Sequence, residues 1–174
     1  MTSETQKVAE ATTEQDQRHG SCLCGKVSLT VTGRPRSCSA CHCSVCRSLT
    51  GAPFSVQSLH ARSNVVCNTS EPELWSLVTS PHVTRYRCRD CGSPVYATLG
   101  AGSGRKIVAV PQSILFRQGK SKDLSSDFQP IHHIYYANRV MDVNDALPKY
   151  VGTSAPGRGV LWTPENGDER PQTS

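Results

Sequence analysis

Short runs of alternating polar and apolar residues recur along the chain. Residues 26–32 alternate in this way and end at Gly33. A period of two is typical of a strand with one buried face. The same pattern predicts strands at residues 53–56, 64–67, 74–78, 83–87, 95–99, 106–110 and 131–136. Segments rich in Gly, Pro and Ser separate these runs and favour turns.

Helical patterns are few. One short helix is predicted at Ser44–Thr50, with Ser44 as its N-cap and Gly51 just after its end. A second, single-turn helix is predicted at Gln112–Leu115. The fold class predicted is therefore mainly β. Small β domains of this kind often need a metal or another cross-link to become stable.

The two ends of the chain differ in composition from its middle. Residues 1–17 are mostly Thr, Glu, Gln and Ser, and residues 152–174 are mostly Gly, Pro, Ser and charged residues. Such segments bury too little apolar surface to offset the entropy of ordering. We therefore predict a disordered tail at 1–17, one folded domain at 18–151, and a mostly disordered tail at 152–174.

The composition also limits the compartment and the partners. No apolar run is long enough to span a bilayer, and the first residues lack the pattern of a secretory signal, so we expect a cytoplasmic protein without a membrane partner. In a reducing compartment, nine cysteines are more typical of metal ligands than of disulfides. The net charge of +5 is spread along the chain, so nucleic acid is not the expected partner. The sequence indicates no oligomeric state.

Two cysteine pairs have the spacing of a structural zinc site. Cys22 and Cys24 are followed by a glycine, and so are Cys88 and Cys91. Two ligands from one tight turn and two from a distant turn satisfy the tetrahedral geometry of zinc with little backbone strain. We predict that these four thiolates close a structural zinc site. Buried free thiols or a redox pair are the alternative.

A third group of cysteines indicates different chemistry. Cys41, Cys43 and Cys46 offer three thiolates within one short segment. Three protein ligands leave one coordination position open, which is the usual state of a catalytic zinc. Cys38 or His42 could instead complete the site and make it structural. Cys67 lies in an apolar strand pattern and is predicted to be a core residue.

Several segments together resemble one known family. Residues 20–27, 41–54 and 87–94 resemble the glutathione-dependent formaldehyde-activating enzymes, a family that also includes the domain of centromere protein V. Residues 130–135 and 147–150 are similar to its C-terminal signature. The resemblance implies a β-tent fold of stacked antiparallel sheets with two zinc ions. Cys22, Cys24, Cys88 and Cys91 would hold the structural ion, and Cys41, Cys43 and Cys46 the catalytic one.

The resemblance also implies an activity. The namesake reaction joins glutathione to formaldehyde, gives S-hydroxymethylglutathione, and is classed with the carbon–sulfur lyases. Residues 137–142 replace a segment in which many relatives carry a Pro-Trp pair, which leaves the substrate open. We therefore expect a zinc-dependent carbon–sulfur lyase that acts on a small-molecule thiol adduct, with glutathione as the co-substrate. A non-catalytic zinc module that binds protein or nucleic acid is the alternative.

Three further residues are candidates for roles in this reaction. Arg47 follows Cys46 and is predicted to bind an anionic group of the substrate. It could equally be a solvated helix residue. His133, or secondarily His132, is predicted to move the proton because histidine titrates near neutral pH. For each histidine, the alternative is a strand residue that faces solvent or the sheet.

Overall fold

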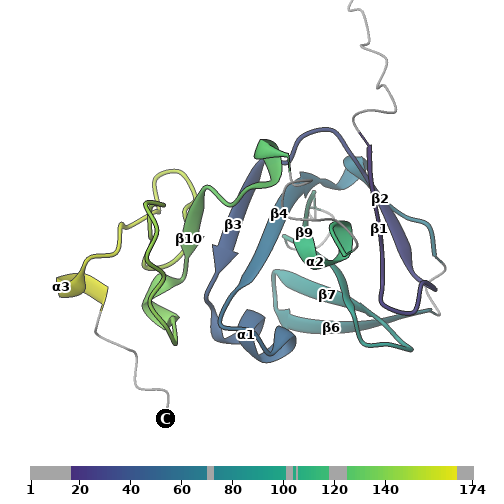
Figure 1. Ribbon diagram of the computed structural model, residues 1–174, viewed down its shortest axis with the longest axis horizontal. Helices are drawn as coiled ribbons and strands as arrows, with labels where there is room; N and C mark the ends of the chain where they lie inside the picture. Colours follow the sequence, from purple (N-terminus) through teal and green to yellow (C-terminus); the bar gives the residue numbers. More distant parts are fainter. Residues whose placement is uncertain (1–16, 70–72, 101–103, 105, 118–124, 168–174) are drawn as a thin grey trace, which may run out of the picture.

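The computed structural model describes residues 17–69, 73–100, 104, 106–117 and 125–167. The predicted N-terminal tail at 1–17 therefore lies outside the described residues except for Gln17. Two sheets form the fold (Figure 1). The smaller sheet has the strand order β1-β2-β5 and is antiparallel. Its strands are β1 (Gln17–Ser21), β2 (Ser28–Thr32) and β5 (Val65–Cys67).

The larger sheet has seven strands in the order β10-β3-β4-β9-β8-β7-β6. Its neighbours pair antiparallel except β10 and β3, which run parallel. The strands are β3 (Ser37–Cys41), β4 (Ser55–Ala61), β6 (Leu74–Ser80), β7 (Val83–Cys88), β8 (Pro94–Leu99), β9 (Ile107–Pro111) and β10 (His132–Ile134). The mainly β class is thus confirmed, whereas β1, β3 and the parallel pair were not predicted.

The helices are short, as predicted. They are α1 (Ser44–Thr50), α2 (Gln112–Leu115) and α3 (Pro164–Gly167), and the last of these was not predicted. Gly51 is the C-cap of α1, as expected. The prediction of Ser44 as its N-cap is wrong by one residue, because Cys43 has the extended cap conformation and its sulfur accepts a hydrogen bond from the Cys46 amide. The start of α1 is therefore built from two cysteines of the predicted catalytic group.

The two faces of the larger sheet have different environments. Alternate residues on one face pack against the smaller sheet and form the core. This core includes Leu29, Val31, Val65, Val95, Val108 and Val110. Burying each such side chain stabilises the fold by roughly 1.5–3 kcal/mol. Residues such as Gln57, Leu59 and Ala109 face the other way and line a cavity.

Part of the predicted C-terminal tail packs onto the fold. Tyr150 pairs with Leu161 in an isolated bridge. The Trp162 ring lies 5.2 Å from that of Tyr136, and the Arg139 guanidinium lies 4.4 Å from the Trp162 ring centroid. These contacts join residues after position 151 to residues before it. The domain boundary at residue 151 stays a prediction.

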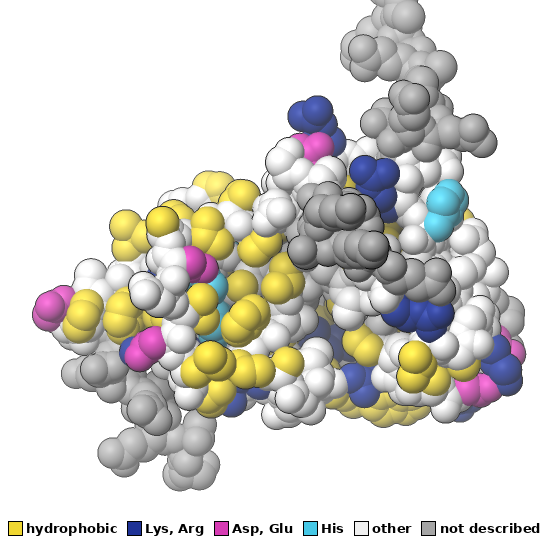
Figure 2. Space-filling view, viewed as in Figure 1, with side chains coloured by type: hydrophobic (Ala, Val, Ile, Leu, Met, Phe, Trp, Pro, Cys, Tyr) yellow, Lys and Arg dark blue, Asp and Glu magenta, His cyan; other side chains and the backbone are white. Residues whose placement is uncertain are grey.

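The distribution of charge on the surface agrees with the spread of charge along the sequence. On the face drawn in Figure 2, Lys and Arg side chains are dispersed rather than gathered into a stripe. Among the described residues, no helix has the length and apolar character needed to cross a bilayer.

One buried histidine gives a pH prediction. His60 is 1% exposed, and burial lowers its pKa from 6.5 to about 4. Below pH 6.5 the unfolded chain therefore binds a proton that the folded chain rejects, and stability falls as the pH falls toward 4. Lowering the pH from 7 to 5 should cost the wild type about 2 kcal/mol more than it costs His60→Leu.

Urea unfolding of both proteins at the two pH values measures this difference. Every other titrating group is shared by the two proteins, so their contributions cancel. An identical pH dependence in the variant would show that His60 does not contribute.

Candidate metal centres

The first cysteine cluster joins two turns that are far apart in the sequence. Cys22 and Cys24 lie in the turn between β1 and β2, while Cys88 and Cys91 lie at the end of β7 and in the turn after it. Their four sulfur atoms all lie within 4.8 Å of one another. The Cys24 sulfur is 3.5 Å from that of Cys22 and 3.7 Å from that of Cys88. Sulfurs placed 2.3 Å from a tetrahedral zinc would be about 3.8 Å apart, so the donor set fits zinc.

The backbone of both turns supports this arrangement. The glycines that follow the two pairs, Gly25 and Gly92, have φ angles of 83° and 70°. Glycine adopts this left-handed conformation without steric cost. The Val27 amide donates a hydrogen bond to the Cys22 sulfur at 3.2 Å. This bond holds the Cys22 side chain in position within the turn.

The second cluster is formed by the end of β3 and the start of α1. The sulfurs of Cys41, Cys43 and Cys46 lie within 4.8 Å of one another. Gln57 Nε2 donates to the Cys46 sulfur at 3.2 Å, and Arg85 Nη2 approaches the same sulfur at 3.6 Å. Three soft sulfur donors and two polarising neighbours fit a zinc ion with one open position.

The thiols of this cluster influence one another strongly. Hydrogen bonds from the Cys41 and Cys46 thiols lower the pKa of Cys43, and the hydrogen bond with Cys43 raises the pKa of Cys41. Neighbouring thiolates repel one another, so a cation is needed to keep all three ionised.

Neither alternative ligand joins the second cluster among the described residues. Cys38 and Cys41 are three positions apart on β3 and therefore face opposite sides of the sheet. The Cys38 sulfur instead contacts the Asp127 carbonyl oxygen at 3.5 Å. His42 is fully buried, and its Nε2 lies 2.9 Å from Nδ1 of His133. The described residues thus supply three donors, not four.

A cavity of about 390 Å³ adjoins this cluster. It lies on the face of the larger sheet opposite the core. Its larger polar side chains are Gln57, Arg85, His132 and Tyr135, and several Ser and Thr residues, including Ser154, also line it. The remaining lining consists of apolar side chains and the three cysteines. A concave, mostly apolar space with a few converging polar groups is typical of a small-molecule site.

Tyr135 has an unusual backbone at the edge of this cavity. It is the one described non-glycine residue with a positive φ, at 54°. Its amide donates to the Gly152 carbonyl oxygen at 2.8 Å. Burial raises the pKa of its hydroxyl, as do the charges of the three cysteines. The hydroxyl therefore keeps its proton and can donate a hydrogen bond. Residues with a strained backbone, such as Tyr135, cluster at functional sites.

The two candidate histidines lie on opposite sides of β10. His132 lines the cavity, and its Nε2 is 2.9 Å from Ser154 Oγ. Burial lowers its pKa, and so does His133. His133 is buried away from the cavity lining, with its Nε2 2.9 Å from Asp145 Oδ2. This arrangement favours His132 over His133 for proton transfer, because only His132 faces the cavity.

Arg47 lies outside the described lining of this cavity. Its Nε donates to the His42 carbonyl oxygen at 3.1 Å. The arginine that approaches the Cys46 sulfur is instead Arg85, which was not predicted to be a site residue. The anion-binding role of Arg47 stays a prediction.

Two packed β-sheets that carry two cysteine clusters define a cysteine-rich class of β protein whose clusters could each hold a metal ion. A family model described as glutathione-dependent formaldehyde-activating enzyme matches residues 17–138. The chain belongs to this family.

The individual proteins that resemble this chain share only a modest part of its sequence. Two proteins, from Aspergillus flavus and Aspergillus oryzae and named for the same enzyme, are each 30% identical over 80 residues. That match covers 45% of this chain and 42% of each relative, so it spans less than half of their length. A crystal structure of a Rhodobacter sphaeroides protein is 20% identical with a TM-score of 0.48, and the match covers 62% of this chain and 95% of that one.

Proposed function

We propose that this protein is a carbon–sulfur lyase that contains two zinc ions and interconverts a thiol, a small carbonyl compound and their adduct. The observation that carries the proposal is the cluster of Cys41, Cys43 and Cys46, which offers three donors beside a cavity. Membership of the family supports glutathione as the thiol. All nine cysteines are free of disulfides, which suits a reducing, cytoplasmic location.

The ligands of the second cluster define what a metal would do there. A zinc ion bound by these three thiolates would offer a fourth position that keeps a substrate thiol ionised at neutral pH. Three thiolates leave the site with a net negative charge. The positive charge of Arg85 offsets part of this charge, and Gln57 donates a hydrogen bond to the same Cys46 sulfur.

Other residues of the cavity would donate a hydrogen bond to the carbonyl oxygen and transfer the proton. Addition forms a sulfur–carbon bond while the thiol loses its proton and the carbonyl oxygen gains one. The Tyr135 hydroxyl can donate to that oxygen as its negative charge develops. The pair formed by His132 Nε2 and Ser154 Oγ can carry the proton. The reverse steps break the same bond and release the two parts.

The proposal is tested by NMR exchange measurements on glutathione and formaldehyde with zinc-counted protein. The wild type should accelerate formation and cleavage of the adduct above the uncatalysed rate. Tyr135→Phe should lower the catalysed rate by about 100-fold, because it loses the donor to the oxygen. Tyr150→Phe, outside the described cavity lining, is the matched control and should keep the wild-type rate.

No acceleration by fully zinc-loaded wild type would overturn the glutathione-dependent function. An unchanged rate in Tyr135→Phe would overturn the role of this tyrosine alone.

A further inference from the structure

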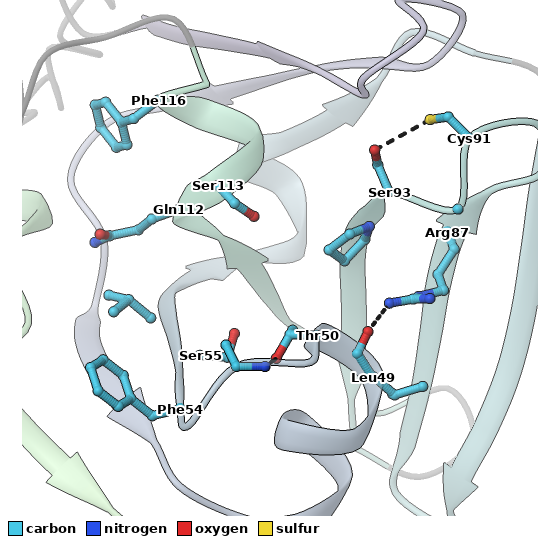
Figure 3. A pocket seen from close by; sticks show the side chains of 14 residues that line it. Leu49, Thr50, Phe54, Ser55, Arg87, Cys91, Ser93, Gln112, Ser113 and Phe116 are labelled. Atoms are coloured by element: carbon cyan, nitrogen blue, oxygen red, sulfur yellow. Dashed lines mark hydrogen bonds between the residues drawn. The ribbon is translucent and has the colours of Figure 1, made fainter. Parts of the chain in front are cut away.

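A second and larger cavity lies beyond the three-cysteine cluster. Its volume is about 770 Å³, and it lies between the C-terminal end of α1, the turn after β7 and helix α2. Figure 3 shows Thr50, Ser55 and Arg87 on one side of this cavity and Ser113 of α2 across from them. The reaction proposed above does not use this cavity.

A small cavity of about 30 Å³ lies between the two larger ones. It shares Thr50, Ser55 and Arg87 with the 770 Å³ cavity. It shares Cys46, Gln57 and Arg85 with the cavity beside the cluster. A space of this size holds a water molecule or a narrow chain of atoms. The small cavity therefore places Cys46 between the two larger cavities.

The charges of the 770 Å³ cavity favour an anion at one end. Arg87 is the single cation of its described lining, and its guanidinium is positioned by a hydrogen bond from Nη2 to the Leu49 carbonyl oxygen. Arginine presents a fork of N–H donors that matches a carboxylate. The other polar residues of this lining, among them Thr50, Ser55 and Ser113, carry no charge. A bound carboxylate would therefore find its cationic partner at Arg87.

The spacing along β7 fits a thiol that reaches from one cavity to the cluster. Arg85, whose guanidinium approaches the Cys46 sulfur, and Arg87 are two residues apart on this strand, so their Cα atoms are about 7 Å apart. The sulfur and the terminal carboxylate of an extended cysteinyl-glycine end are also on the order of 7 Å apart. The strand thus spaces its two arginines on the length scale of such a thiol.

We propose that the 770 Å³ cavity is a binding site for the carboxylate end of the thiol substrate, with Arg87 as its partner, while the carbonyl compound enters from the opposite cavity. The inference rests on the proposed function. It gives the two reactants separate entrances that meet at Cys46. Thiols that lack a carboxylate at this distance from the sulfur should bind more weakly.

Calorimetric titration of the zinc-loaded full chain tests this site, with glutathione and its diethyl ester as probes. Arg87→Met should weaken glutathione binding at least about tenfold, the loss of one charge-assisted hydrogen bond. The ester should bind the wild type about tenfold more weakly, and Arg87→Met should weaken it no further. Arg34→Met is the matched control, since the Arg34 side chain is 83% exposed, and it should bind as the wild type does.

A second variant tests whether Arg87→Met acts only indirectly, through loss of the hydrogen bond between Arg87 and the Leu49 carbonyl oxygen. Ser113→Trp fills the cavity from the α2 side, where Ser113 is exposed, and leaves that contact in place. It should also weaken glutathione binding at least tenfold while both zinc ions remain. Glutathione affinity at the wild-type level in Ser113→Trp and in zinc-loaded Arg87→Met would overturn the site. Absence of glutathione binding to the wild type would instead overturn the proposed function together with it.

Discussion

Cys88→Ser is expected to unfold the protein at room temperature. Cys88 is 1% exposed at the end of β7, and its sulfur belongs to the four-cysteine cluster. A structural zinc site contributes roughly 10–16 kcal/mol to folding. The whole domain is expected to be stable by only about 5–15 kcal/mol. Because loss of one ligand opens the site and leaves the other thiols crowded, most of this contribution should disappear.

Circular dichroism and zinc content measure the result. The variant should lose its cooperative thermal transition and retain less than one zinc ion per chain. Cys67→Ser is the matched control because Cys67 belongs to neither described cluster, and it should unfold cooperatively with its zinc retained. A cooperative transition near the wild-type temperature in Cys88→Ser would show that the cluster does not hold the fold together.

The cysteine clusters were predictable because the spacing of neighbouring cysteines along the chain already indicates which of them share a turn. Two ligands separated by one or two residues must share a turn, and glycine after each pair allows that turn. The chemistry of zinc then requires that the turns at Cys22 and Cys88 meet. The sequence could also separate Cys38 from Cys41, had the strand β3 been recognised, because residues three apart on a strand face opposite sides.

The strand β3 itself was missed for a physical reason. Its residues are Ser, Cys, Ser, Ala and Cys, which are small and carry little strand propensity. Their burial comes from neighbours β4 and β10. The partner β10 follows some ninety positions later along the chain, so the parallel pair between Ser39 and His132 depends on long-range packing.

The residues around the cavity also depend on long-range packing that the sequence does not show. Arg85 lies in a segment whose polar and apolar residues alternate as in a strand. Only the position of that strand in the sheet shows that the Arg85 side chain faces the cysteines rather than water. Neighbouring His132 and His133 must face opposite sides of β10, but the sequence does not say which side holds the cavity. No local signal indicates the left-handed backbone of Tyr135, since glycine is the usual residue there.

Cys46→Ser is expected to keep the fold and lose the second metal ion. Cys46 contributes one of three sulfurs at the start of α1, while the core of the two sheets lies elsewhere. A serine hydroxyl of similar size leaves the helix intact but is a poor ligand for zinc. The zinc content should fall from two ions to one per chain, and the catalysed rate by at least about 100-fold.

Cys38→Ser is the matched control for this variant. Cys38 precedes the cluster on the same strand but contacts the Asp127 carbonyl oxygen on the other face. It should keep two zinc ions and the wild-type rate. A Cys46→Ser protein that retains both ions and its activity would show that this cysteine is not a ligand.

The central claim, an open three-thiolate metal site that takes a thiol, is tested most directly with cobalt in place of zinc. Absorption from thiolate-to-cobalt charge transfer reports how many thiolates coordinate the metal. Addition of glutathione to the cobalt-loaded wild type should increase this absorption by the share of one further thiolate, and Cys46→Ser should show no increase. An unchanged wild-type spectrum at saturating glutathione would contradict the account, because it would mean that the second site takes no thiol.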